Sequence, residues 1–203
     1  MKIDYLFSDI DTTTRKALQM DDVAEYSVSP PWMSKIICET IAKVLQTNEL
    51  SITDGTACVG GDTIRFCQAF TSVNAVESDA TRVHMLRLNV SIVGCADKVV
   101  IYHDSYLSVC DTLVQDVVYL DAPWGGPSYI DMAHIDLFLD GIPIVDVCAR
   151  AWDRTRLIVL KVPCNFNMMA FKVEGASKLP RAQIVSMPVG RLHLLFIRKK
   201  PAL

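Results

Sequence analysis

The 203-residue sequence predicts an α/β fold, a doubly wound and mostly parallel sheet of about seven strands. Short apolar runs of strand length alternate with segments whose apolar residues recur at helical spacing. Acidic residues follow the first four of these runs. The last two runs are separated by residues 188–191 alone, and so short a link suits an antiparallel hairpin at the C-terminal end of the sheet.

The elements follow this alternation along the chain. Residues 1–28 carry three aromatic side chains (Tyr5, Phe7 and Tyr26), which a linker would not carry, so we expect an N-terminal cap over the site. Ser29 precedes two prolines and predicts a helix N-cap, with a helix to about residue 46. Strands are predicted over residues 50–54, 73–79, 98–104, 116–121, 157–162, 183–187 and 192–197. Helices are predicted over residues 63–70, 81–93, 106–113, 141–152 and 168–174. We expect residues 1–203 to form one domain, with a Rossmann-like core over residues 29–203.

Composition limits the function classes. The chain is 51% hydrophobic, yet no apolar run reaches the roughly 20 residues that a bilayer span needs, and its start lacks a signal-peptide core. The seven cysteines form no Cys-x-x-Cys pair and the four histidines have no ligand spacing. This pattern indicates reduced thiols in the nucleus or cytoplasm, of cellular or viral origin, without a metal site. A formal net charge of −3 excludes coating of long nucleic acid, so any RNA contact should be local.

Polar residues cluster where the predicted strands end, which is where such sheets bind ligands. The glycine-rich turn after Asp54 allows close backbone approach, and Gly60 precedes free N–H groups at a helix start. Glu77 is placed to bind the hydroxyls of a ribose, and Asp104 to accept from an adenine amino group. Either acid alone could equally be a solvated strand end. Because Gly-x-Gly-x-x-Gly is absent, S-adenosylmethionine is preferred over a dinucleotide. The candidate cofactor-binding residues are Asp54, Thr56, Ala57, Gly60, Glu77, Ser78, Asp104, Ser105 and Asp121.

A tryptophan loop follows the fourth strand, in the run Asp121-Ala122-Pro123-Trp124-Gly125-Gly126-Pro127. Its Gly-Gly-Pro is expected neither to continue a strand nor to begin a helix. Trp124 offers a flat face to a flat ligand, and the Asp121 carboxylate with the neighbouring carbonyls can accept from a ring amino group. A lone Trp is more often a core residue, but a loop this poor in side chains has little core to offer. The loop therefore predicts N-methylation of a nucleobase.

These motifs resemble the trimethylguanosine synthase family of RNA cap guanine-N2 methyltransferases. The resemblance rests on residues 54–66, residues 26–30, Asn89, the aromatic start at residues 5–9 and, above all, Pro-Trp-Gly-Gly-Pro at residues 123–127. It implies the class I S-adenosylmethionine-dependent methyltransferase fold. It also implies methyl transfer to the exocyclic N2 of N7-methylguanosine in an RNA 5′ cap, giving di- or trimethylguanosine.

The resemblance also implies roles for single residues. Ser27 matches a position near the cap base, and N7-methylguanine is a cation that would gain roughly 0.5–2 kcal/mol over an indole. No general base is expected, because the proton can leave after methyl transfer. The expected catalytic residues are Asp121, Pro123, Trp124 and Ser27. The expected substrate-binding residues are Trp124, Ser27, Tyr129, Asn165 and Phe7. Capped RNA is the expected partner, without membrane or metal; the oligomeric state is left open, and a monomer is compatible with the sequence.

Three positions depart from the family pattern. Ala57-Cys58 stands where the family has Cys-Gly, which places a side chain near the methionine end of the cofactor. Ala122 replaces the first proline of the tryptophan loop, and Cys164 stands where the family tends to place an arginine toward the cap phosphates. Candidate replacements for that phosphate contact are Lys2, Arg15, Lys16 and Lys161.

Two other functions stay open. The Asp-x-Pro-Trp run also resembles the loop of adenine-N6 methyltransferases of RNA or DNA, although these need a basic track that a net charge of −3 does not suggest. A catalytically silent cap-binding subunit would keep the tryptophan and lose the cofactor through Cys58 and Ala122.

Overall fold

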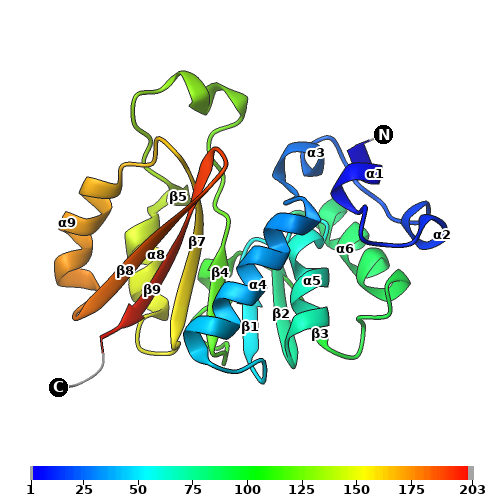
Figure 1. Cartoon of the computed structure of the whole chain (residues 1–203), viewed down its shortest axis with the longest axis horizontal. Helices are drawn as coiled ribbons and strands as arrows, with labels where there is room; N and C mark the ends of the chain where they lie inside the picture. The colour runs from blue at the N-terminus through cyan, green and yellow to red at the C-terminus, as the bar shows by residue number, and fades with distance from the viewer. Residues whose placement is uncertain (1, 201–203) are drawn as a thin grey trace. The chain divides into compact units, whose positions relative to one another are not determined.

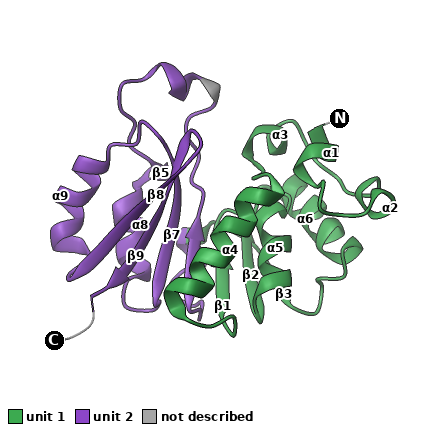
Figure 2. Ribbon diagram, viewed as in Figure 1, with its two compact units in different colours: residues 1–106 green, residues 107–203 purple. Residues whose placement is uncertain are grey.

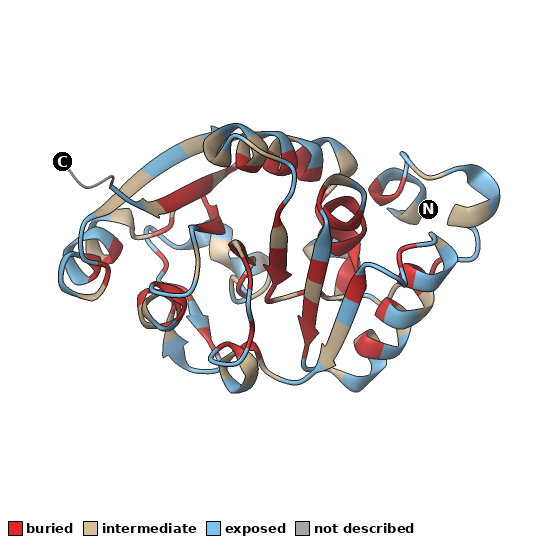
Figure 3. Ribbon diagram, turned by 90° about the horizontal axis from the view of Figure 1, so that it is seen from below, coloured by how far each residue is buried: buried red, intermediate tan, exposed pale blue. Residues whose placement is uncertain are grey.

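The computed structural model describes residues 2–200, with only the backbone of Pro127. The chain divides into two compact units, Met1–Tyr106 and Leu107–Leu203 (Figure 2). Figure 1 gives the order of helices and strands along the chain. Buried residues, drawn red in Figure 3, concentrate along the strands and on one side of the helices. Within residues 2–200, no helix combines the length and the apolar character that a membrane span requires.

The first unit contains a parallel sheet with the strand order β3-β2-β1. Ser51 pairs with Ser72, and Val73 with Val99, so the carboxyl ends of neighbouring strands lie side by side. The strands begin and end close to where the sequence predicts. Their bounds are β1 (Ser51–Asp54), β2 (Ser72–Glu77) and β3 (Val99–His103), and the helices are α4 (Pro31–Leu45), α5 (Gly61–Ala69) and α6 (Ala80–Ile92).

The start of α4 corrects one prediction. The N-cap is Pro30, and Pro31 occupies the first helical position, where its missing N–H costs nothing. Ser29 lies one residue before the N-cap, and its hydroxyl donates to the carboxylate of Asp62 in α5 at 2.8 Å. Asp62 also accepts from the Ser34 hydroxyl at 2.5 Å, so this buried carboxylate joins α4 to α5.

The first 28 residues form three short helices that pack onto α5 and α6. The helices are α1 (Lys2–Leu6), α2 (Thr12–Arg15) and α3 (Ala24–Ser27). Leu6, Phe7, Leu18, Ala24 and Val28 form one buried apolar cluster with Val59 and Ile64. We call this set the N-terminal cluster. It gives the N-terminal segment an apolar core shared with the glycine-rich turn.

Two buried polar side chains join the same segment to the helices. Arg65 is 5% exposed, and it donates to the Asp9 carboxylate at 2.6 and 3.0 Å and to the Leu6 and Gly61 carbonyls. The Asn89 amide nitrogen donates to the carbonyls of Gln19 and Val59 at 2.8 and 2.9 Å, and its oxygen accepts from Gln19 N–H. A buried charge and a buried amide are thus both satisfied by residues of the N-terminal segment.

The second unit contains a mixed sheet with the strand order β4-β7-β9-β8. β4 and β7 are parallel, whereas β9 runs antiparallel to both β7 and β8. Every residue of β4 and β7 is buried, which explains their continuous apolar runs. The bounds are β4 (Val117–Leu120), β7 (Leu157–Pro163), β8 (Ala182–Val189) and β9 (Leu192–Lys199). The predicted seven-stranded, mostly parallel α/β fold with an antiparallel C-terminal hairpin is confirmed.

Helix bounds in and next to this unit correct three predictions. The predicted helix over residues 106–113 stops early as α7 (Tyr106–Val109), and the Val109 carbonyl then accepts from the Thr112 hydroxyl and from the N–H groups of Thr112 and Leu113. The helix predicted from residue 141 begins later as α8 (Ile144–Ala151), after a hairpin of β5 (Phe138–Leu139) and β6 (Ile142–Pro143). Asp140 and Gly141 turn this hairpin at φ 49° and 78°. α9 (Met168–Lys178) runs through Gly175, beyond the predicted end at residue 174.

The tryptophan loop contains an unpredicted element. A 3₁₀ helix, η1 (Pro127–Asp131), begins directly after Gly126, so the expectation that Gly-Gly-Pro cannot begin a helix is wrong. Proline fits the first helical position because its fixed φ suits the helix and no N–H is needed there. Gly125 and Gly126 supply φ of 85° and 80°, which reverses the chain before η1.

Candidate active site

The glycine-rich turn between β1 and α5 has no room for side chains at two positions. Gly60 has φ 96°, and a Cβ there would lie 2.8 Å from Leu86 Cδ1. A Cβ on Gly61 would lie 2.5 Å from Val28 Cγ1, in the N-terminal cluster. Both glycines are therefore required by packing on α6 and on the N-terminal segment.

Asp54 fixes the shape of this turn. Its carboxylate is 1% exposed and accepts from the Thr63 hydroxyl at 2.6 Å and from Thr56 N–H at 3.4 Å. Ala57 N–H donates to the Val76 carbonyl at 2.9 Å, which joins the turn to β2. The predicted site residues Asp54, Thr56 and Ala57 are thus together in one turn that their own hydrogen bonds preorganise.

Glu77 connects the end of β2 to the same turn. Its Oε2 accepts from Cys58 N–H at 2.9 Å, its Oε1 accepts from Asp79 N–H at 2.8 Å, and Arg82 Nε lies 3.5 Å from Oε1. An ionised carboxylate has about four acceptor positions, so Oε2 keeps a lone pair for a further donor, whereas Arg82 already lies beside Oε1. Sequence reasoning found this acid but missed that it holds the turn.

The third predicted acid, Asp104, follows β3 next to Glu77. Asp104 N–H donates to the Glu77 carbonyl at 3.1 Å, and its own carboxylate accepts from Ser105 N–H at 2.8 Å. Asp104 and Ser78 are exposed, whereas Ser105 is half-buried. The ends of three neighbouring parallel strands thus bring together the turn, the Glu77 carboxylate with a further acceptor position on Oε2, and an exposed carboxylate.

Cys58, the first departure from the family pattern, has φ 49° in the left-handed region. Glycine adopts this conformation without strain, and a cysteine costs roughly 1–2 kcal/mol there. The Cys58 side chain packs against the N-terminal cluster. Burial raises the pKa of its thiol to about 12. The side chain is therefore accommodated by the apolar cluster.

Thiol alkylation checks this arrangement. At pH 8 the Cys58 thiolate should be scarce, because the raised pKa leaves about one group in 10⁴ ionised. Cys164 is exposed, whereas Cys148 and Cys38 are buried with raised pKa values. We expect iodoacetamide to label Cys164 first, and peptide mass spectrometry gives the order. Labelling of Cys58 as fast as Cys164 in the folded protein would contradict the packing of Cys58.

In the second unit, Trp124 is half-buried after the end of β4. Tyr129 lies edge-on to its ring, with centroids 5.0 Å apart at 81°, and Lys161 Nζ lies 5.6 Å from the ring centroid. The indole Nε1 is buried, with no hydrogen-bond partner among the described residues. The surroundings of the ring are thus aromatic and charged.

Asp121 and Lys161 form an ion pair beside this ring. Their Oδ2 and Nζ atoms are 2.5 Å apart, and the side chains are 15% and 8% exposed. Sequence reasoning treated Lys161 only as a candidate phosphate contact. Parallel pairing of Leu120 with Leu160 places the next residues of both strands side by side, a register that the sequence alone does not show. The opposite charges of Asp121 and Lys161 therefore balance each other next to the Trp124 ring.

Asn165 holds the tryptophan loop. Its Nδ2 donates to the carbonyls of Tyr129 and Met132, both at 2.8 Å. Ala122, the second departure from the family pattern, is buried, and Pro123 beside it is exposed. Asn165 therefore positions the loop: it binds the Tyr129 carbonyl, and the Tyr129 ring contacts the Trp124 ring.

The predicted site residues of the N-terminal segment, Phe7 and Ser27, differ in their exposure. Phe7 is fully buried, with the Arg65 guanidinium 4.9 Å from its ring centroid, while Ser27 is half-buried at the end of α3. Lys2 pairs with Glu25, and Arg15 pairs with Asp4. Within residues 2–200 no three His, Cys, Asp or Glu side chains are grouped to hold a metal ion.

Comparisons with known proteins give one family. The sequence model of the RNA cap guanine-N2 methyltransferase family matches residues 50–187. An uncharacterized protein of Acanthamoeba polyphaga mimivirus is 32% identical over 128 residues, which cover 61% of this chain and 50% of that protein. The trimethylguanosine synthase of Schizosaccharomyces pombe is 29% identical over 130 residues, which cover 61% of this chain and 52% of the enzyme. The chain thus matches about half the length of these two relatives.

A solved structure has the same fold. It is the T. thermophilus 16S rRNA N2 methyltransferase (RsmC) in complex with AdoMet and guanosine. The TM-score is 0.62 at 18% identity, and the match covers 86% of this chain and 44% of that one.

Proposed function

Because this chain belongs to the RNA cap guanine-N2 methyltransferase family, we propose that it methylates the exocyclic N2 of N7-methylguanosine in an RNA 5′ cap. The predicted class I methyltransferase fold is confirmed, and the methyl donor is S-adenosylmethionine. The trimethylguanosine synthase and the guanosine-bound rRNA N2 methyltransferase support guanine N2 as the acceptor. The proposal assigns the donor to the first unit and the acceptor base to the second.

The residues of the first unit fit the donor. Glu77 offers a lone pair on Oε2 to a ribose hydroxyl, and Asp104 offers an exposed acceptor for an amino group. Gly60 has φ 96°, a backbone conformation that glycine adopts without strain. When bound, S-adenosylmethionine supplies an electrophilic methyl on a sulfonium. We propose Asp54, Thr56, Ala57, Gly60, Glu77, Ser78, Asp104 and Ser105 as the residues that shape and line this site, and the N-terminal segment as its cap.

The observation that carries the choice of base is the half-buried Trp124, with charge-balanced Asp121 and Lys161 beside it. A cationic base over an indole gains roughly 0.5–2 kcal/mol, which neutral guanine does not. Lys161 alone would repel that cation, but its charge is matched by Asp121 at 2.5 Å. Trp124 is therefore the proposed selector of the N7-methylated base.

The remaining task of the protein is to orient a weak nucleophile. An arylamine needs alignment with the methyl group and exclusion of water, which positioned groups supply. We propose that the Asp121 carboxylate and the Ala122 and Pro123 carbonyls accept the hydrogens of N2. Tyr129 and Asn165 support the ring and the loop. Ser27 is proposed only from its match to the family position, and Phe7 is left out because its ring is covered.

Mass spectrometry of cap analogues tests the function. We expect the protein with S-adenosylmethionine to add 14 Da to m7GpppA, with fragmentation placing the methyl on guanine N2, and to leave GpppA nearly unmodified. Equal methylation of both would remove the role of the base cation. Methylation of an adenosine oligonucleotide in place of the cap would favour the adenine-N6 alternative. Absence of heat on calorimetric titration with S-adenosylhomocysteine would favour the silent subunit.

Glu77→Gln is expected to weaken the binding of S-adenosylhomocysteine by about tenfold or more, a loss of about 1.4 kcal/mol in binding free energy. The amide keeps one acceptor oxygen and turns a donor toward either Cys58 N–H or Asp79 N–H, which breaks one bond that holds the turn. Calorimetry measures the affinity. Glu49→Gln, at an exposed position before β1, is the matched control and should change nothing. Unchanged affinity in Glu77→Gln would remove Glu77 from the cofactor site.

A further inference from the structure

A small pocket lies in the second unit, at the carboxyl end of β7. Its volume is about 150 Å³, and its walls come from β7, from the segment leading to α9 and from the β8–β9 hairpin. Typical sites for drug-sized ligands have roughly 300–1,000 Å³. The pocket therefore has room for one planar ring system and not for a whole nucleotide.

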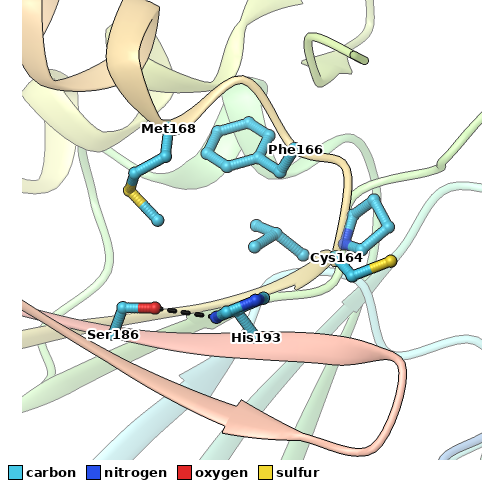
Figure 4. Close-up of a pocket in the computed structure, with 7 residues that line it drawn as sticks. Cys164, Phe166, Met168, Ser186 and His193 are labelled. Carbon is cyan, nitrogen blue, oxygen red and sulfur yellow. Dashed lines mark hydrogen bonds between the residues drawn. The ribbon is translucent and has the colours of Figure 1, made fainter. Parts of the chain in front are cut away.

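The two sides of this pocket differ in chemistry (Figure 4). Phe166 and Met168 form an apolar side, and the Phe166 ring is held by Phe171 with centroids 5.6 Å apart. Across from them, Ser186 Oγ and His193 Nδ1 share a hydrogen bond of 2.9 Å, which leaves Nε2 of the imidazole for a ligand. A nucleobase has the matching character, with apolar faces and a polar edge.

The pocket is joined to the tryptophan loop by one residue. Asn165 lies between Cys164 and Phe166, which both line the pocket, and its amide donates to the loop carbonyls of Tyr129 and Met132. One segment thus forms a pocket wall and fixes the loop of Trp124. A chain whose first base lies on Trp124 can present its next base on this side of the same unit.

An arginine, Arg191, lies in the turn of the β8–β9 hairpin. Its backbone carbonyl accepts from the N–H of Cys164, which lines the pocket, at 3.2 Å. Arg191 is exposed, and within residues 2–200 no carboxylate forms an ion pair with it. A guanidinium in this position suits a phosphate, which it can bind through two parallel hydrogen bonds.

We propose that this pocket binds the base of the first nucleotide after the cap, with Arg191 pairing with a phosphate that leads to it. The inference rests on the proposed function and extends it, because it makes the substrate a capped RNA and not the isolated cap guanosine. A base would pack against the apolar side formed by Phe166 and Met168, and its polar edge would bind the Ser186–His193 pair. No other base-specific contact is needed. The site should therefore tolerate several bases.

The experiment compares KM for m7GDP and m7GpppA in the wild type and in two methionine variants. Met168→Ala removes an apolar wall of the pocket, whereas Met169→Ala removes the neighbouring side chain, which is 73% exposed and does not line it. We expect Met168→Ala to raise KM for m7GpppA about five- to tenfold and to leave KM for m7GDP unchanged. Met169→Ala should change neither value, and Arg191→Gln should raise only the KM for m7GpppA.

Several outcomes would overturn the inference while the proposed function stands. Equal KM values for both substrates in the wild type would show that nothing beyond the cap guanosine is bound, and an equal effect of Met168→Ala on both substrates would show the same. If neither substrate is methylated, the proposed function fails. Calorimetric titration with m7GpppA then tests, independently of methylation, whether the pocket binds the base. Binding that weakens in Met168→Ala but not in Met169→Ala supports the pocket, and equal or absent binding overturns it.

Discussion

Trp124→Ala is expected to lower kcat/KM for an N7-methylguanosine cap by about 100-fold or more, with S-adenosylhomocysteine affinity unchanged. The substitution removes the surface for the cationic base, worth roughly 0.5–2 kcal/mol, and also the alignment of N2. A misplacement of about 1 Å can alone cost about 100-fold in rate. Tyr129 and Lys161, which contact the ring, belong to the same loop and to β7, so the first unit should keep its cofactor site.

Kinetics with m7GpppA measure the change in kcat/KM, and calorimetry measures the affinity for S-adenosylhomocysteine. Trp32→Ala is the matched control, because Trp32 lies on α4 at 46% exposure and has no role in the proposal. Trp124→Phe keeps an aromatic face and should recover part of the rate. Loss of both activity and cofactor affinity in Trp124→Ala, together with a lower Tm, would identify Trp124 as a core residue.

Arg65→Met is expected to lower the free energy of unfolding by about 3–5 kcal/mol, because Asp9 loses its buried partner and the Leu6 and Gly61 carbonyls lose a donor. The guanidinium is 5% exposed and contacts α1, the Gly61 carbonyl and the Phe7 ring. Methionine keeps much of the apolar stem but none of the donors. Urea unfolding followed by circular dichroism measures the change.

Arg87→Met is the control for Arg65→Met, since Arg87 is exposed on α6. This variant should lower the free energy of unfolding by less than about 1 kcal/mol. Limited proteolysis adds a second readout, because loss of Arg65 should expose residues 1–28 to cleavage before the rest. A destabilisation of Arg65→Met no larger than that of Arg87→Met would mean that the N-terminal segment is held by apolar contacts alone.

The strands were predictable because they are buried on both faces or end in acids. β7 is buried at all of its residues, and its apolar run in the sequence reflects that directly. Tertiary contacts explain the errors. Ser29 is a residue type typical of helix N-caps, but Pro30 is the N-cap of α4, and the Ser29 hydroxyl donates to Asp62, 33 residues away. The β5–β6 hairpin was hidden because its two-residue strands are too short to show a period.

The acids of the site were predictable from their positions at strand ends, whereas their partners were not. Glu77 and Asp121 follow strands, which the sequence shows, but the bonds from Cys58 N–H and Lys161 join residues far apart in the chain. The direction of the Cys58 side chain could not be predicted either, because it depends on φ 49° at that residue and on the helices packed over it. The sequence predicts substrate binding for Asn165, whereas its hydrogen bonds to the loop carbonyls depend on the tertiary structure.

The packing of the glycine-rich turn sets where this domain can be shortened. Val28 lies against Gly61, and Val59 and Ile64 share their cluster with Leu6, Phe7 and Leu18. The region matched by the family begins at residue 50, so five of the seven buried residues of the N-terminal cluster lie outside it. A truncated protein beginning at Ser29 would expose the other two side chains to water and strand a guanidinium without its counter-ion. Residues that look dispensable from the boundaries of the family match are therefore part of the folding unit.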